Sequence, residues 1–106
     1  MFTEQRKNER KVLRVRARVS MEGAAPVSGR TSDLGINGVS ISLPDPLQVG
    51  QTGQVSFDLL IDGNIVPINA RAKALYCIFS NGDFKVGFQF LHLELAATTA
   101  VARFLR

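Results

Sequence analysis

Arg10 and Arg14 are the residues of this 106-residue chain best suited to bind a small anionic ligand. A guanidinium can hold a phosphate through two parallel hydrogen bonds, contact the O6 and N7 edge of guanine, or stack on a purine. Because the two residues are four positions apart, an extended segment would place both groups on one face, about 13 Å apart. This separation suits a ligand with two anionic ends. Arg6 with Arg10 and Arg14 with Arg18 share the spacing, so it is not specific by itself.

A polar turn about twenty residues later could complete such a site. Asp33 has a carboxylate that can accept the N1 and N2 protons of guanine. Gly35 and Gly38 would let backbone amides approach a ligand, or would simply let the chain turn. An ordinary turn in which Asp33 caps its own backbone is the alternative, and the turn alone does not decide between the two.

Positive charge is concentrated at the N-terminus. Residues 1–20 hold seven bases against two acids, whereas the rest of the chain holds six bases against seven acids. A partner selected by electrostatics should therefore be anionic and should meet this segment. A solvated basic tail without a partner is the open alternative.

The chain offers little for catalysis. His92 is the only histidine and Cys77 the only cysteine, so these side chains cannot form a metal cluster, a Ser-His-Asp triad or an internal disulfide. Glycine signatures of phosphate loops and dinucleotide folds are also absent. We expect no enzymatic activity, no cofactor and no metal.

Alternating hydrophobic and polar residues predict strands. Leu13 to Met21 alternates strictly, which is typical of a half-buried strand. The loop at Glu22 to Gly29 precedes a second strand near Arg30, and a further strand covers Val39 to Leu43.

Two hairpins follow. Asp62-Gly63 and Asn81-Gly82 are dipeptides that two-residue turns favour because both positions need positive φ. These turns would join Val55 to Leu59, Ile65 to Phe79 and Phe84 to Phe90 into an antiparallel meander.

The C-terminal segment, residues 94–106, predicts a helix because it is rich in Ala and Leu and lacks Gly and Pro. Residues near one stripe are expected to lie on the sheet: Leu91, Leu95, Thr98, Ala102 and Leu105. About six strands followed by one helix predict an all-β fold, a closed or nearly closed antiparallel barrel with a helical lid.

The chain is expected to form one domain, residues 13–106, preceded by a flexible basic arm at residues 1–12. Its start has no apolar run typical of a secretory signal or membrane anchor, and a single cysteine fits a reducing compartment. We therefore expect a cytoplasmic location.

Three segments together resemble the PilZ domain family over nearly the whole chain: Arg10 to Arg14, the turn from Asp33 to Gly38, and the strand Val86 to Leu91 before the helix. The resemblance implies a six-stranded antiparallel barrel with a helix, and a cyclic di-GMP site built from an Arg-x-x-x-Arg pair and an Asp-x-Ser-x-x-Gly turn.

Carried over by position, the resemblance implies that Arg10 and Arg14 hold guanines and phosphates. It implies that Asp33 binds a guanine edge and that Gly38 keeps the turn tight. Arg6 is a further candidate. Gly35 replaces the serine of the motif, which removes one hydroxyl contact and is expected to weaken binding by about 0.5 to 1.5 kcal/mol.

The resemblance implies a bacterial receptor and adaptor that binds cyclic di-GMP and relays the signal to a protein of the motility, pilus or exopolysaccharide machinery. A divergent domain that binds no nucleotide and acts as a protein interaction module is the alternative, supported by Gly35. A nucleic-acid binder is disfavoured because most of the aromatic residues follow strand-core patterns.

Overall fold

The structure is a computed structural model that describes residues 9–106. It contains seven strands and one helix in the order β1 (Arg10–Val12), β2 (Arg16–Met21), β3 (Val27–Gly35), β4 (Gly38–Leu43), β5 (Thr52–Ile61), β6 (Asn64–Ser80), β7 (Asp83–Leu93) and α1 (Leu95–Phe104).

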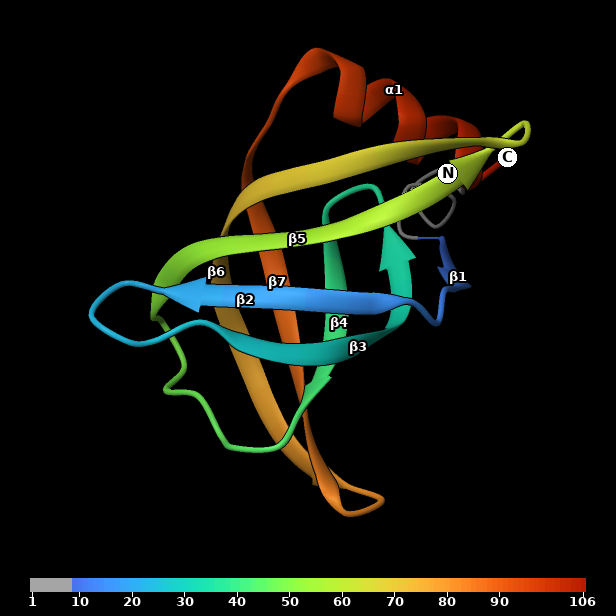
Figure 1. The fold of residues 1–106 in the computed structure, drawn as a ribbon. Coiled ribbons are helices and arrows are strands. Elements are labelled where there is room, and N and C mark those ends of the chain that lie inside the picture. The colour runs from blue at the N-terminus through green and yellow to red at the C-terminus, as the bar shows by residue number, and fades with distance from the viewer. Residues whose placement is uncertain (1–8) are drawn as a thin grey trace, which may run out of the picture.

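Six of the strands close into an antiparallel barrel (Figure 1). The sheet runs β3-β2-β5-β6-β7-β4, and β4 pairs again with β3 to complete the ring. The short β1 lies outside the ring, on β3. The prediction of a six-stranded antiparallel barrel with a C-terminal helix is confirmed.

The first predicted strand is interrupted. Instead of one strand from Leu13 to Met21, the chain forms β1 and β2, which both pair with β3 and are separated by residues 13–15. Residues 13–15 lie opposite only two residues of β3, residues 31–32, so the regular ladder of hydrogen bonds cannot continue. The buried Thr31 hydroxyl fills the break. It accepts a hydrogen bond from Val15 N at 2.9 Å and donates one to the Leu13 carbonyl.

Part of the predicted arm is ordered by this arrangement. Residues 10–12 form β1, and Lys11 Nζ donates to the carbonyl of Arg106 at 2.5 Å. Residues 1–8, with Arg6, lie outside the described residues. The division into a flexible arm and a barrel therefore stays a prediction.

Both predicted hairpins are present. Asp62 and Gly63 have φ of 52° and 82°, and Asn81 and Gly82 have φ of 51° and 87°. These left-handed conformations give the two turns the twist that the flanking strands need. The strands β5, β6 and β7 form the predicted meander and are longer than predicted.

The core lies inside the barrel, where strand residues point inward at every second position, such as Val55, Phe57 and Leu59 on β5. The helix α1 covers one end (Figure 1) through Ala97, Ala100 and Val101. The prediction of which helix residues are buried against the sheet was wrong, because Leu95 is 82% exposed. The small alanines let the helix approach the barrel, and they define its buried face.

Candidate functional site

A β-bulge turns Asp33 outward. Thr31 pairs with Ile41 and Asp33 pairs with Ser40, so β3 has one more residue than β4 between these two pairs. The extra residue lets Thr31 and Leu34 both face the core, while Asp33 lies on the outer face of the barrel. The carboxylate is therefore accessible on a rigid strand rather than in a mobile turn.

Register places a row of four residues side by side on this outer face: Asp33, Ser40, Gly87 and Tyr76. Partners in an antiparallel ladder share a face, so the row crosses β3, β4, β7 and β6. The hydroxyls of Ser40 and Tyr76 are 3.1 Å apart and hydrogen-bonded. We call these residues the outer-face row.

Gly87 is the position that lets the Tyr76 ring lie on the sheet. A Cβ at this residue would lie 2.1 Å from Tyr76 Cε2, so any residue other than glycine would displace the ring. The ring covers Ser40, which is 1% exposed, while the Tyr76 residue is 37% exposed. Tyr76 thus presents an aromatic face to solvent beside the charged end of the row.

The Arg10 side chain extends from β1 to Asp33, at the end of the row opposite Tyr76. Its Nε donates to Asp33 Oδ1 at 2.7 Å and its Nη2 donates to the Gly38 carbonyl at 3.4 Å. The side chain passes over Gly35, where a Cβ would lie 3.0 Å from Arg10 Nη1. Arg10 and Tyr76 line a shallow hollow of about 290 Å³, which we call the smaller hollow.

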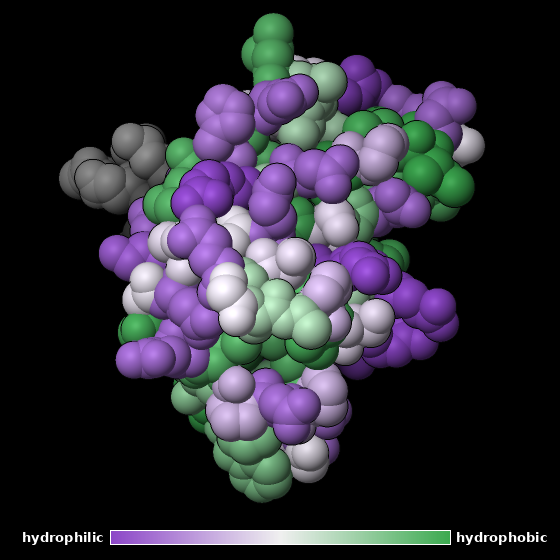
Figure 2. All heavy atoms as spheres, turned by 60° about the vertical axis from the view of Figure 1, so that its left-hand side comes forward, coloured by the Kyte–Doolittle hydropathy of each residue, from purple (hydrophilic) through white to green (hydrophobic). Residues whose placement is uncertain are grey.

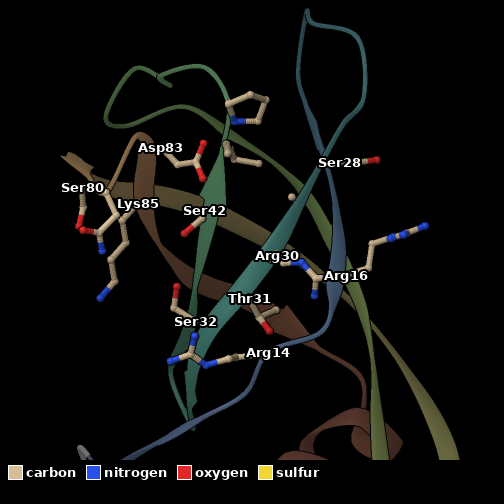
Figure 3. Close-up of a pocket in the computed structure, with 14 residues that line it drawn as sticks. Arg14, Arg16, Ser28, Arg30, Thr31, Ser32, Ser42, Ser80, Asp83 and Lys85 are labelled. Atoms are coloured by element: carbon tan, nitrogen blue, oxygen red, sulfur yellow. The ribbon is translucent and has the colours of Figure 1, made fainter.

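Arg14 lines a different and larger hollow of about 830 Å³. Figure 3 shows its side chain reaching from the break between β1 and β2 toward Ser32 of β3. Lys85 lines the same hollow, and its Nζ lies 3.8 Å from Asp33 Oδ2. Asp33 therefore lies between the two hollows and interacts with one cation of each.

The structure brings together most of the residues named from the sequence. The Arg10 side chain contacts Asp33, Gly35 and Gly38 and lines the smaller hollow, and Arg14 lines the larger one. Arg6 lies outside the described residues. Only residues 36–37 separate β3 from β4, so the turn is shorter than the segment from Asp33 to Gly38.

Gly35 and Gly38 each have a packing role within the barrel. Neither Gly35 nor Gly38 has a positive φ. A Cβ at Gly38 would lie 2.1 Å from the Phe88 carbonyl oxygen, so this glycine allows β4 to pack tightly against β7. Gly35 leaves room for Arg10.

Tyr76, Gly87 and Lys85 were missed from the sequence. They come from β6 and β7, more than forty residues after Asp33, and only the closed barrel brings them to it. One signal was available. Gly87 interrupts a strand of alternating residues, and a glycine inside a strand often marks a close approach.

Within residues 9–106, no group of three or more His, Cys, Asp or Glu side chains is placed to hold a metal. The helix of this described part of the chain is too short to cross a membrane.

Solved structures with this architecture share low sequence identity with the chain. The Bacillus subtilis inhibitor of motility, MotI/DgrA, is 13% identical with a TM-score of 0.83, over 93% of this chain and 48% of that one. The chain thus spans about half the length of that protein. The PilZ domain of YcgR from Escherichia coli, solved with c-di-GMP, is 13% identical with a TM-score of 0.71, over 95% and 88% of the two chains.

A third similar structure is the PilZ domain of CeSA from a cellulose-synthesizing bacterium. It is 23% identical with a TM-score of 0.56, over 92% of this chain and 94% of that one. At these identities the likeness shows the fold. No curated protein matches the sequence significantly.

Sequence evidence for the family is independent of these structures. The model of the PilZ domain family matches residues 4–106, which is nearly the entire chain. The chain therefore belongs to the PilZ domain family.

Proposed function

We propose that this protein is a bacterial, cytoplasmic receptor that binds cyclic di-GMP on the outer face of the barrel and relays the signal to a protein partner. The observation that carries the proposal is that Arg10 and Tyr76 line the smaller hollow while Arg10 also binds Asp33 on the same outer face. A cation, a carboxylate and an aromatic ring on one rigid face are the three groups that a guanine nucleotide can use.

Each group has a distinct role in the proposal. Arg10 and Arg14 bind phosphates or guanine edges from the two adjoining hollows, which suits a ligand with two anionic centres. The exposed part of the Tyr76 ring stacks on a base. Asp33 accepts guanine protons, while its contact with Arg10 holds it in position.

A related structure supports the proposal, because the PilZ domain of YcgR was solved with c-di-GMP. A domain of this kind acts through a partner. The similar protein MotI/DgrA is an inhibitor of motility, which favours motility machinery among the candidate partners.

Calorimetric titration of cyclic di-GMP tests the proposal. We expect saturable binding by the wild type. Arg10→Ala and Arg14→Ala should each weaken it about tenfold or more, because each removes hydrogen bonds from a charged donor. Arg71→Ala is the matched control. It removes one positive charge at an ion pair with Glu22, away from both hollows, and should leave the affinity unchanged. GMP, with one base and one phosphate, should bind far more weakly.

A protein interaction module that binds no nucleotide is the second candidate. Gly35 in place of the motif serine favours it, as does the Arg10–Asp33 pair, in which two ligand-binding groups already bind each other. No heat and no thermal shift at high cyclic di-GMP concentration would support this candidate and contradict the receptor.

A further inference from the structure

Two arginines lie directly opposite each other on neighbouring strands. Arg16 of β2 and Arg30 of β3 are register partners, so their side chains share the outer face, and both are exposed (Figure 3). Like charges placed opposite each other in an antiparallel ladder repel and destabilise the sheet. This pair therefore costs folding stability.

The repulsion extends along the strand. Arg14 and Arg18 are two residues to either side of Arg16 and are exposed as well. Among the described residues, none of these four arginines forms an ion pair, whereas Arg10, Arg71 and Arg103 each do. We call Arg14, Arg16, Arg18 and Arg30 the arginine face.

Two acidic residues lie near these arginines but offset their positive charge only weakly. Asp58 lines a hollow with Arg16 and Arg18 but forms no ion pair with either. Asp83 lines the larger hollow with Arg16 and Arg30 and likewise forms no ion pair within the described part of the chain. Four close cations are thus left without a bound carboxylate, and an anionic partner would relieve their repulsion.

An apolar surface adjoins the arginine face. Arg30 pairs with Ser42, Ser42 with Lys85, and Lys85 with Ile78, so the row ends on the β6–β7 hairpin. Ile78 shares the outer face with the arginines and is 54% exposed, whereas the neighbouring Phe79 points to the other face of the hairpin. Figure 2 shows hydrophobic side-chain atoms at the lower tip of the molecule, beside hydrophilic ones, where Figure 1 places this hairpin.

We propose that the arginine face and the β6–β7 hairpin together dock an acidic segment of a partner protein, whose carboxylates bind the arginines while an apolar side chain packs on Ile78. Guanidinium groups bind carboxylates through two parallel hydrogen bonds, and large apolar side chains are the usual anchors of protein interfaces. An extended nucleic acid would use the same cations but would also need aromatic rings to stack on, and the row that runs from Arg16 through Arg30, Ser42 and Lys85 to Ile78 contains no aromatic residue.

This inference names the chemistry of the partner and goes beyond nucleotide binding. Arg16 and Arg30 line the larger hollow beside Arg14, whereas Arg18 lines neither this hollow nor the smaller one, and peptide binding is measured with no nucleotide present. The surface can therefore be tested without cyclic di-GMP, and its failure is separable from failure of the receptor.

The test is fluorescence anisotropy with a labelled peptide of about twelve residues, rich in glutamate and carrying one phenylalanine, beside an oligouridine of about equal charge. We expect the double variant Arg16→Gln, Arg30→Gln to weaken peptide binding about fivefold or more. The control double variant Arg71→Gln, Arg103→Gln removes the same charge elsewhere and should change binding little. Ile78→Ser should weaken binding of the peptide and leave binding of the oligouridine unchanged.

Thermal unfolding gives a second readout that requires no ligand. Arg30→Gln should raise the melting temperature by about 2 °C because it removes the repulsion with Arg16. No peptide binding, equal weakening by the control variant, or tighter binding of oligouridine that depends on Arg16 and Arg30 would each overturn the proposal. A melting temperature lowered by Arg30→Gln would contradict its physical basis.

Discussion

Gly35 is the residue at which this chain departs from the motif that its family uses, and the structure shows what the change does locally. The Arg10 side chain lies over this glycine, and the nearest atoms to an added Cβ are Nη1 and Cγ of that flexible side chain. A serine could therefore be accommodated by a small shift of Arg10. The sequence correctly identified the loss of a hydroxyl but not the space that Arg10 takes.

We predict that Gly35→Ser increases the affinity for cyclic di-GMP about threefold to tenfold, because it adds one neutral hydrogen bond. Calorimetry measures the change. Asn64→Ser, at an exposed position at the start of β6 that lines neither hollow, is the matched control and should alter the affinity little. A lower affinity in Gly35→Ser would mean that the position of Arg10, rather than the missing hydroxyl, limits binding.

Tyr76 is predicted to act through its ring. Tyr76→Ala should weaken cyclic di-GMP binding by about 1 to 3 kcal/mol, the usual value of a base stacked on an aromatic side chain. Tyr76→Phe keeps the ring and removes only the hydrogen bond to Ser40, so it should lower stability by about 1 kcal/mol with little effect on affinity. Equal losses of affinity in the two variants would contradict stacking.

At the scale of the element, the break between β1 and β2 depends on one hydroxyl. Thr31 satisfies Val15 N and the Leu13 carbonyl, and Arg14 lies between these two residues. Thr31→Val keeps the shape of the side chain and leaves both groups unpaired, which should cost about 1 to 3 kcal/mol of unfolding free energy.

Urea unfolding checks this cost, with Thr31→Ser as the control that keeps the hydroxyl. Because the break positions Arg14, Thr31→Val should also weaken nucleotide binding while the barrel remains folded. A variant with wild-type stability would show that water satisfies these groups and that Thr31 does not define the break.

A second link joins the end of β2 to β6. Glu22 accepts a hydrogen bond from Arg71 Nη2 at 2.5 Å, and this bond, the charge of Arg71 and a hydrogen bond from Thr52 lower the pKa of Glu22 below its usual value. A carboxyl with a lowered folded-state pKa stabilises the protein above its ordinary pKa, and the contribution is lost as the pH falls through the folded-state value.

Arg71→Gln should therefore reduce stability at neutral pH, and the difference from the wild type should shrink as Glu22 becomes protonated. Unfolding curves measured from neutral to acidic pH test this expectation. A difference that stays constant over that range would show that Arg71 contributes through packing alone. The effect should be small because both side chains are exposed.

At the scale of the whole molecule, local signals in the sequence predicted the elements well. The dipeptides Asp62-Gly63 and Asn81-Gly82 determine their turns through backbone sterics, which act within a few residues. Alternation likewise predicted which residues of the meander face the core. The helix was located correctly, but its buried face depends on Ala97 and Ala100, whose small size matters only against the barrel.

The composition of the outer-face row could not be predicted in the same way. Its members meet because β4 pairs with both β3 and β7, and because a bulge shifts the phase of β3 by one residue at Asp33. Bulges have no reliable sequence signature, and a shift of one residue moves every side chain to the other face. Tyr76 could be assigned to the site only from the closed barrel.

Backbone amide NMR shifts, mapped as cyclic di-GMP is added, would locate the nucleotide site without any substitution. We predict that the largest changes fall on Gly35, Gly38, Ser40 and Gly87, around Arg10 and Tyr76. Amides of the β2–β3 loop, such as Gly23, and of α1, such as Ala97, should change little. No saturable change at millimolar ligand, or changes centred on the β2–β3 loop or α1, would contradict the assignment of this face as the nucleotide site.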